Sequence, residues 1–333
     1  MTAFRFCSFA LSHEKPALAS PAVRACALAV EVAMSPLIKA PPGLATSYRL
    51  PSLLEDIRLL DLLELSGSTQ AASLSLQLSQ PSVSRRYRAL AHDFALTPCR
   101  RAPWGIRYGN SEPIRLLRLA CRAHRLTAGV ARLGADVILQ PLLQGQGCWL
   151  PSPPRFRSVS CWLELVRQGV LDGALLSGLE LQAQTDWHAA DLELVRVGAV
   201  NLGLALPAQR AMANAGAATA VLVPHQAIAP GLHGALQILG LRLHTAGHRC
   251  QSADQWLRRL ERAGLAMPLP ELAAADWWLT LRRLPLASAL TLPLWLAMPL
   301  DWQRQPVMVS VVELLRLRYT DKLQGGPGEV RLA

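Results

Sequence analysis

The sequence predicts two unlike folds in one chain: an α+β winged helix-turn-helix domain at the N-terminal side, then a linker helix and a larger α/β domain. Three short helical segments, with a tight turn between the second and third, lie within residues 53–90, the plan of a helix-turn-helix. Beyond residue 134, short apolar strands alternate with helices, which is typical of an α/β domain or of two such halves. The chain has 333 residues, 51% of them hydrophobic, so it can bury cores of this size.

The first predicted helix is indicated by an apolar stripe with helical spacing, Leu53, Ile57, Leu60 and Leu63. Gly67 breaks this helix. Ser68 is a suitable N-cap for a short second helix, because its hydroxyl can accept a hydrogen bond from a free N–H of the first turn.

The third predicted helix begins after Ser79, and Pro81 falls early in it, where a missing N–H costs nothing. Val83, Tyr87 and Leu90 form its inward stripe. This leaves serines and arginines for the outer faces.

Residues 98–110, PCRRAPWGIRYGN, predict a small hairpin that would form a wing. A helical pattern follows and predicts a linker or dimerisation helix. We therefore expect an extension over residues 1–48, a winged helix-turn-helix domain over 49–112, a linker helix over 113–133, an α/β domain over 134–320 and a tail over 321–333. The proline-rich extension predicts either a loose tail or a true start at Met34.

The net charge of +11 comes almost entirely from arginine, since the chain has only three lysines. Eleven arginines lie between Gln80 and Arg132, and only Asp93 and Glu112 oppose them, a local balance of 11 − 2 = +9. Arginine suits phosphate, and phosphate neutralisation supplies most non-specific affinity for DNA. A run of charge is also compatible with a merely solvated face. Its coincidence with a helix-turn-helix favours double-stranded DNA as the partner.

Other functional classes find less support in the sequence. Seven cysteines lie far apart, which indicates a reducing compartment. The longest apolar run, residues 284–300, contains three prolines, so we expect no membrane span and a cytoplasmic protein. His244, His248 and Cys250 do not complete a metal-ligand set, and no activated nucleophile is visible. We expect no enzyme activity, no metal and no cofactor.

Residues 53–112 resemble the N-terminal domain of LysR-type transcriptional regulators. The ungapped stretch GSTQAASLSLQLSQPSVSRRYRAL carries the pattern, in Gly67-Ser68, Ser79-Gln80-Pro81 and Ser84-Arg85. Weaker similarity extends to about residue 317, best in LELVRQGVLDGALLSG. The resemblance implies a two-lobed, periplasmic-binding-protein-like effector domain, a small-molecule effector, and a homodimer or homotetramer on a partly palindromic site.

Within this pattern, Gln80 can pair with adenine and Arg85 with guanine or phosphate. Ser68 can hold a phosphate at a helix N-terminus, a role compatible with simple capping. Arg107 of the wing can enter the minor groove or touch the backbone. The predicted DNA-binding residues are Ser68, Gln70, Ser79, Gln80, Pro81, Ser82, Ser84, Arg85, Arg86, Arg88, Arg101 and Arg107. Residues 135–139 are the first predicted strand of the α/β domain, and Gln140, which follows it, is the effector-binding candidate.

The sequence also departs from the family. A link rich in glycine and proline occupies residues 140–154, where the family has a long helix that walls the effector cleft. One alternative is therefore a DNA-binding protein of the same ancestry with a degenerate sensor, acting constitutively or architecturally. A second alternative is an enzyme that uses its basic domain to reach nucleic acid, although no acidic metal cluster is visible.

Overall fold

The computed structural model describes residues 48–49, 51–97, 106–144, 148–184, 187, 190–207, 220–248, 250–271, 281–284, 286 and 290–319. All of these belong to one compact unit that spans residues 44–333. The predicted extension, except for Tyr48, the turn of the predicted wing and the predicted tail lie outside the described residues.

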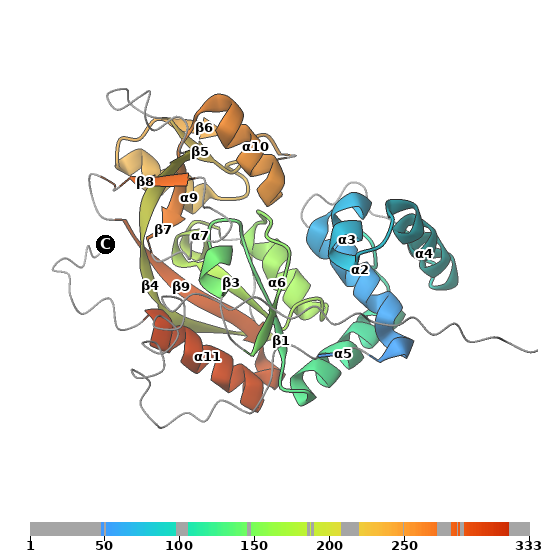
Figure 1. Cartoon of the computed structure of the whole chain (residues 1–333). Coiled ribbons are helices and arrows are strands. Elements are labelled where there is room, and N and C mark those ends of the chain that lie inside the picture. Colours follow the sequence, from blue (N-terminus) through green and yellow to red (C-terminus); the bar gives the residue numbers. More distant parts are fainter. Residues whose placement is uncertain are drawn as a thin grey trace, which may run out of the picture. The chain divides into compact units, whose positions relative to one another are not determined.

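The three predicted N-terminal helices are present. After a short 3-10 turn, η1 (Ser52–Leu54), come α2 (Glu55–Ser66), α3 (Thr69–Leu76) and α4 (Gln80–Asp93) (Figure 1). Their shared core is made of the apolar positions that the helical stripe predicts, together with two residues of the next helix, α5 (Glu112–Thr127). The buried members are Ile57, Leu59, Leu60, Leu63, Ala72, Val83, Leu90, Leu96, Ile114 and Cys121.

Helix α5 ends at Thr127, so the prediction of a linker helix to residue 133 is wrong. Gly129 takes the left-handed conformation, with φ 74°. The N–H groups of Gly129 and Val130 donate to the carbonyls of Leu126 and Arg125, which closes the helix C-terminus. The chain then enters strand β1 (Ala131–Ala135) at once, so no long free linker separates the helices from the sheet.

The main sheet has the strand order β2-β1-β3-β9-β4-β7, with β8 also paired to β4. Strands β1, β2 (Trp149–Pro151) and β3 (Gly173–Ser177) are parallel, and β9 (Leu290–Pro299) is antiparallel to β3. Strand β4 (Leu192–Pro207) pairs with the whole of β9 through its residues 192–202. Figure 1 shows these two long strands running from the half that contains β1 and β3 into the half that contains β7 and β8. The α/β domain therefore has the two halves that the sequence predicts.

The second half also holds β7 (Met267–Pro270), β8 (Leu281–Leu284) and a small parallel pair, β5 (Val221–Val223) and β6 (Leu243–Thr245). The remaining elements are α6 (Val159–Arg167), α7 (Gly178–Ala183), α9 (Pro230–Ile238), α10 (Ala253–Ala263), α11 (Pro306–Tyr319), η2 (Gln140–Leu143) and η3 (Leu300–Trp302). Serine N-caps begin α6 and α10, at Ser158 and Ser252. Both helices bury a tryptophan, Trp162 and Trp256, in the cores beneath them.

None of the described helices has the length and apolar character needed to cross a membrane. The part of the apolar run from residue 290 onward is strand β9 and the start of η3. The described cysteines, Cys121, Cys148, Cys161 and Cys250, carry free thiols.

Candidate nucleic-acid interface and ligand pocket

Local capping by serines fixes the N-terminal ends of α3 and α4. Ser68 accepts a hydrogen bond from the Ala71 N–H at 3.1 Å, and Ser79 accepts one from the Ser82 N–H at 3.3 Å. Gln77 ends α3 in the left-handed conformation, with φ 54°. This conformation is uncommon for a residue with a side chain, and here it reverses the chain within three residues. The capping roles proposed for Ser68 and Ser79 are confirmed, and their contacts with DNA stay predictions.

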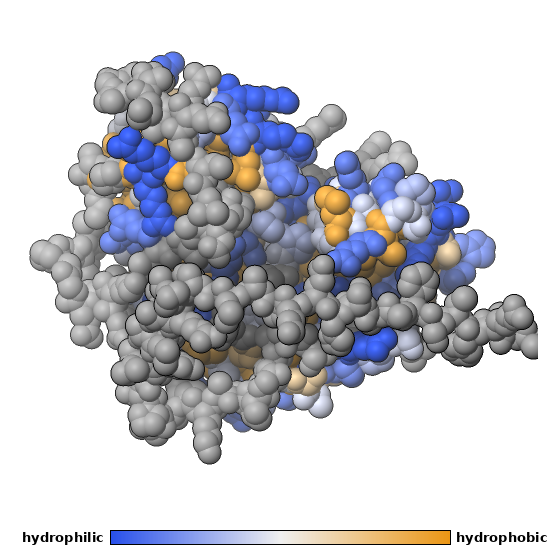
Figure 2. All heavy atoms as spheres, viewed as in Figure 1, coloured by the Kyte–Doolittle hydropathy of each residue, from blue (hydrophilic) through white to orange (hydrophobic). Residues whose placement is uncertain are grey.

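Helix α4 presents a strongly basic outer face. Arg85, Arg86 and Arg88 are exposed, whereas Val83 and Leu90 are buried on the inner face. Arg85 and Arg86 make no ion pair or hydrogen bond within the described part of the chain, and Arg88 donates only to the Ser84 carbonyl. Figure 2 shows hydrophilic residues gathered over the part of the molecule that Figure 1 labels α4.

The first turn of α4 is polar and is tied to α3. The Gln80 side-chain amide donates to the Thr69 hydroxyl at 3.1 Å, which leaves its carbonyl oxygen available for another donor. Ser79 and Ser82 share a hydrogen bond of 2.8 Å. The other predicted residues of this region, Gln70 and Pro81, are exposed, and Ser84 is half-buried.

The predicted wing is described only from Ile106 onward, and Arg101 lies outside the described residues. Residues 106–110 contain no strand. Instead, the buried Glu64 carboxylate accepts the N–H groups of Arg107, Tyr108 and Gly109 at 2.5 to 3.1 Å. Sequence reasoning missed this role of Glu64. The contact fixes the Arg107 backbone beside α2 and leaves its side chain half-buried.

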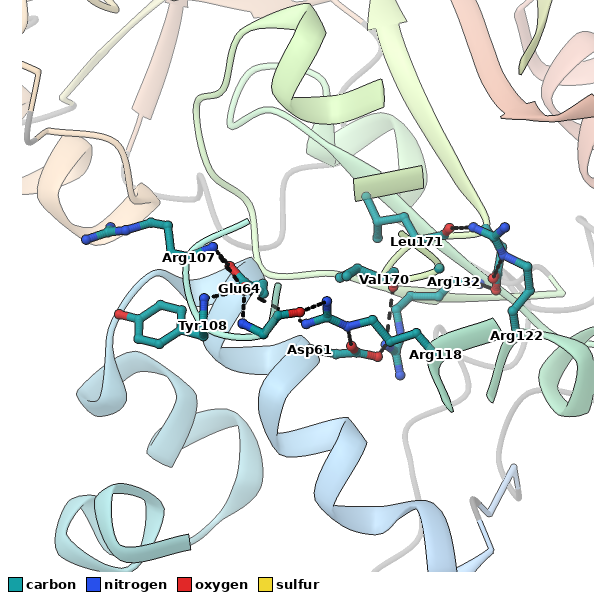
Figure 3. A network of polar contacts seen from close by, with 12 residues as sticks. Asp61, Glu64, Arg107, Tyr108, Arg118, Arg122, Arg132, Val170 and Leu171 are labelled. Atoms are coloured by element: carbon teal, nitrogen blue, oxygen red, sulfur yellow. Dashed lines mark hydrogen bonds and ion pairs between the residues drawn. The ribbon is translucent and has the colours of Figure 1, made fainter. Parts of the chain in front are cut away.

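Several arginines that raised the local charge are not on the surface, and this corrects the charge argument. Arg118, Arg122, Arg125 and Arg132 are buried, and Arg115 pairs with Glu112 at 2.6 Å. The partners of the four buried arginines are two buried aspartates far away in the sequence, Asp61 and Asp172. Figure 3 shows Asp61 beside Arg118. Among the described arginines of residues 80–132, the fully exposed ones are therefore those of α4.

Asp61 of α2 is the first of these partners. One of its oxygens accepts from Arg118 Nε at 2.9 Å, and the other accepts from Arg132 at 2.7 Å. Arg118 also donates to the Gly109 carbonyl. Since Arg132 belongs to β1, this aspartate joins the helix-turn-helix to the α/β sheet.

Asp172, just before β3, is the second partner. Arg125 donates to both of its oxygens, at 2.9 and 2.7 Å. Arg122 lies 3.3 Å from one of them, and the Arg132 N–H donates at 2.7 Å. Burial alone would raise the pKa of Asp172, but the Arg125 and Arg122 guanidiniums outweigh it and leave this pKa below its usual range.

A small pocket, with a cavity volume of about 30 Å³, lies at the carboxyl ends of β1 and β3, the place where open α/β sheets bind ligands. Asp136 follows β1, Ser177 ends β3, and Glu180 lies in the helix after it. The walls are mostly apolar. The complete lining is Asp136, Ile138, Leu139, Phe156, Arg157, Ser177, Glu180, Leu202, Pro224, Ile228, Ala229, Leu232 and Leu292.

Both carboxyls of the pocket are held by backbone N–H groups. One oxygen of Asp136 accepts from Ile138 and Leu139, each at 2.8 Å. Glu180 accepts from Leu232 at 2.8 Å and Gly231 at 3.2 Å, the first turn of α9. Burial raises the pKa of Asp136 to about 6 and that of Glu180 to about 7, because these hydrogen bonds only partly offset the loss of solvent.

The Asp136 carboxyl gives a pH prediction. Its folded pKa is raised, so the stability of the folded state falls as pH rises from about 4 through 6, where only the unfolded chain loses the proton. An asparagine side chain at this position would keep the oxygen that accepts both N–H groups. We expect Asp136→Asn to raise the free energy of unfolding by about 1–2 kcal/mol at pH 8 and hardly at all at pH 4. The full rise in the pKa of Asp136 would correspond to at most ~3 kcal/mol.

Urea denaturation at both pH values measures this difference. The exposed Asp301→Asn serves as the matched control and should show no such dependence. An equal effect of Asp136→Asn at pH 4 and pH 8 would contradict the assignment.

Gln140 lies in η2, one residue beyond the pocket lining, and is buried. Its role in effector binding stays a prediction. The 3-10 turn η2 stands where the glycine- and proline-rich link begins, and no α-helix lies in the described residues between β1 and β2. No cluster of three or more His, Cys, Asp or Glu that could hold a metal occurs in the part of the chain that the structure describes.

No protein-family model matches the chain, and no curated protein matches it either. Similar solved structures include CbnR, a LysR family transcriptional regulator, at 16% identity over 80% of this chain and 99% of that chain, with a TM-score of 0.42. HinK, a LysR family transcriptional regulator from Pseudomonas aeruginosa, is 15% identical over 83% and 100%, with a TM-score of 0.39. Full-length LysG from Corynebacterium glutamicum, with arginine bound as effector, is 19% identical over 80% and 99%, with a TM-score of 0.36. The similar structures are thus LysR-family regulators at low sequence identity.

Proposed function

We propose that this protein is a sequence-specific, DNA-binding transcriptional regulator of the LysR type, controlled by a small-molecule effector. The observation that carries the proposal is the outer face of α4, the second helix of the helix-turn-helix. It combines an exposed glutamine in the first turn with three exposed arginines and no acidic residue before Asp93. A helix of this kind fits the major groove, where base edges present a readable pattern.

In this arrangement Gln80 reads a base, because its amide is already oriented by Thr69. Arg85, Arg86 and Arg88 contact phosphates or guanine. The N-termini of α3 and α4, at Ser68 and Ser79, add backbone N–H groups that favour phosphate. Gln70, Pro81, Ser82, Ser84, Arg101 and Arg107 complete the proposed contact surface.

We propose that the regulator acts as a homodimer or homotetramer. One face of α5 is buried against the chain itself, but Leu116 on the other face is 55% exposed and Ala120 is exposed beside it. An exposed apolar pair on a helix supports a contact with a second copy. A symmetric assembly would match a partly palindromic site.

The pocket supports control by an effector over a constitutive, architectural role. A few polar groups converge on largely apolar walls, which is the make-up of small-molecule sites. The proposal assigns no catalytic residue and no cofactor.

Selection of preferred duplexes from a random pool tests the proposed function. We expect enrichment of one sequence that wild type binds more tightly than a scrambled duplex. Gln80→Ala should reduce this preference by about tenfold, or ~1.4 kcal/mol, which lies within the ~1–3 kcal/mol expected for one base contact. Binding to the scrambled duplex should change little.

The matched control is Gln237→Ala, an exposed helical glutamine of α9, which should leave the preference unchanged. Failure of the wild-type protein to enrich any sequence would refute sequence-specific recognition.

A further inference from the structure

The segment between β2 and α6 holds the C-terminal end of α2. Arg157 donates to the carbonyls of Glu64 and Leu65 at 2.5 and 2.8 Å. Arg155 donates to the carbonyl of Ser66 at 2.7 Å. The last carbonyls of a helix have no partner within the helix and attract cations, so these two arginines fix the end of α2.

The contact is close because Gly67 has no side chain. A Cβ atom at this position would lie 2.2 Å from a terminal nitrogen of Arg155. Helix α3 starts at Thr69, directly after this glycine and the Ser68 cap. A displacement of the two guanidiniums would therefore also displace the first residues of α3, where the helix-turn-helix begins.

The same segment forms a wall of the pocket. Phe156 and Arg157 line it. Phe156 also packs against Trp256 with the two rings tilted and their centroids 4.5 Å apart, and its N–H donates to the Gln251 carbonyl. Arg155 donates twice to the Gln251 side chain, at 3.1 and 2.7 Å. The segment is thus held by the second half of the α/β domain on one side and by α2 on the other.

We propose that Arg157 transmits occupancy of the pocket to the helix-turn-helix. A compact, mainly apolar ligand that presses on Phe156 and Arg157 would shift the guanidinium on the last turn of α2, and with it the start of α3. Packed interiors pass on such a shift because they contain little free volume. An effect of this link on DNA binding rests on the proposed function, whereas the coupling between the pocket and α3 does not.

Arg157 has a property suited to this role. Its Nε is buried and finds no acceptor among the described residues, so one donor of the guanidinium is not committed to α2. An acceptor group on the ligand can accept a hydrogen bond from Nε of Arg157. The hydrogen bonds from the same guanidinium to the Glu64 and Leu65 carbonyls then have to change.

The test uses a substitution in place of the unidentified ligand. Ala229, a buried residue of the pocket wall before α9, is changed to leucine, which fills part of the pocket. The effect on α2 and α3 is read by amide hydrogen exchange of residues 66–76, without DNA, and by binding to the enriched duplex. Both are measured in wild type, Arg157→Met and Arg258→Met backgrounds, the last being an exposed arginine of α10.

We expect Ala229→Leu to change exchange of residues 66–76 and the DNA dissociation constant by about fivefold or more in wild type, the lower range of measured couplings between sites. The change should be the same in Arg258→Met and under about twofold in Arg157→Met. If Ala229→Leu or Arg157→Met does not fold, Ala229→Val and Arg157→Lys replace them, with a smaller but still Arg157-dependent effect expected.

Each other outcome is informative. An equal effect of Ala229→Leu in the Arg157→Met background, or no effect in folded wild type, would overturn the link. Coupled exchange in a protein that enriches no DNA sequence would leave the link standing and refute the proposed function. Sequence-specific DNA binding that Ala229→Leu does not change would overturn the link and leave the proposed function standing.

Discussion

Replacing Asp172 by alanine is expected to lower the free energy of unfolding by about 3–5 kcal/mol, because it removes one partner of a buried ion pair. Arg122 and Arg125 would remain in the interior with their positive charge, and the Arg132 N–H would lose its acceptor. Urea denaturation at pH 7 measures this change. The control is Asp191→Ala, which removes the solvent-exposed partner of Arg167 and should cost less than about 1 kcal/mol.

The Asp172 contribution also has a pH signature. Its folded pKa is lowered, so its stabilisation is present above the unfolded value near 4 and is lost as pH falls through the folded pKa. The difference between wild type and Asp172→Ala should therefore shrink below pH 4. A loss of less than about 1 kcal/mol at pH 7 would show that the buried charges are compensated elsewhere.

The combined change of Arg85, Arg86 and Arg88 to alanine is expected to weaken DNA binding on the order of 100-fold at 0.1 M salt. If each arginine neutralises one phosphate, the slope of log affinity against log salt should fall by about 3. Folding should be nearly unaffected, since all three side chains are exposed. Binding titrations at several salt concentrations measure both quantities.

A matched triple variant controls for loss of charge in general. Arg258, Arg262 and Arg304 are exposed on the α/β domain, and changing all three to alanine should alter the slope by less than about 1. Equal weakening by the two triple variants would mean that the whole surface attracts DNA and that α4 has no special part.

The helices of the DNA-binding part could be predicted because their signals are local. The apolar stripe of α2 and the serine caps before α3 and α4 depend on neighbours within one or two turns. The end of α5 was misplaced, although Gly129 was a usable signal for a C-terminus just before it.

The charge distribution could not be predicted in the same way. A count of arginines along the sequence does not reveal that Arg118 finds Asp61, 57 residues away, or that Arg125 finds Asp172, 47 residues away. Such pairs depend on how α5 packs on α2 and on the residues just before β3, which is tertiary information.

The pocket residues were missed, although a signal for them exists. Asp136 comes directly after a buried strand and Glu180 three residues after another, and the carboxyl ends of parallel strands gather at one edge of a sheet. Sequence reasoning chose Gln140 because the first strand was predicted four residues too late, at residues 135–139 instead of Ala131–Ala135. With the strand in its observed place, Asp136 would have been the natural candidate.

The two acids of α2 bear on how the chain can be divided. Asp61 is neutralised by Arg118 and Arg132, and Glu64 lies 3.8 Å from Arg118. Both arginines come after residue 112, where the helix-turn-helix region ends in the sequence. A fragment that stops there would remove both guanidinium partners of Asp61 and the Arg118 partner of Glu64, which would keep only its hydrogen bonds from the N–H groups of residues 107–109. We therefore expect helices α2 to α4 to unfold together with the sheet, and the shortest fragment that keeps both partners of Asp61 extends at least through Arg132 in β1.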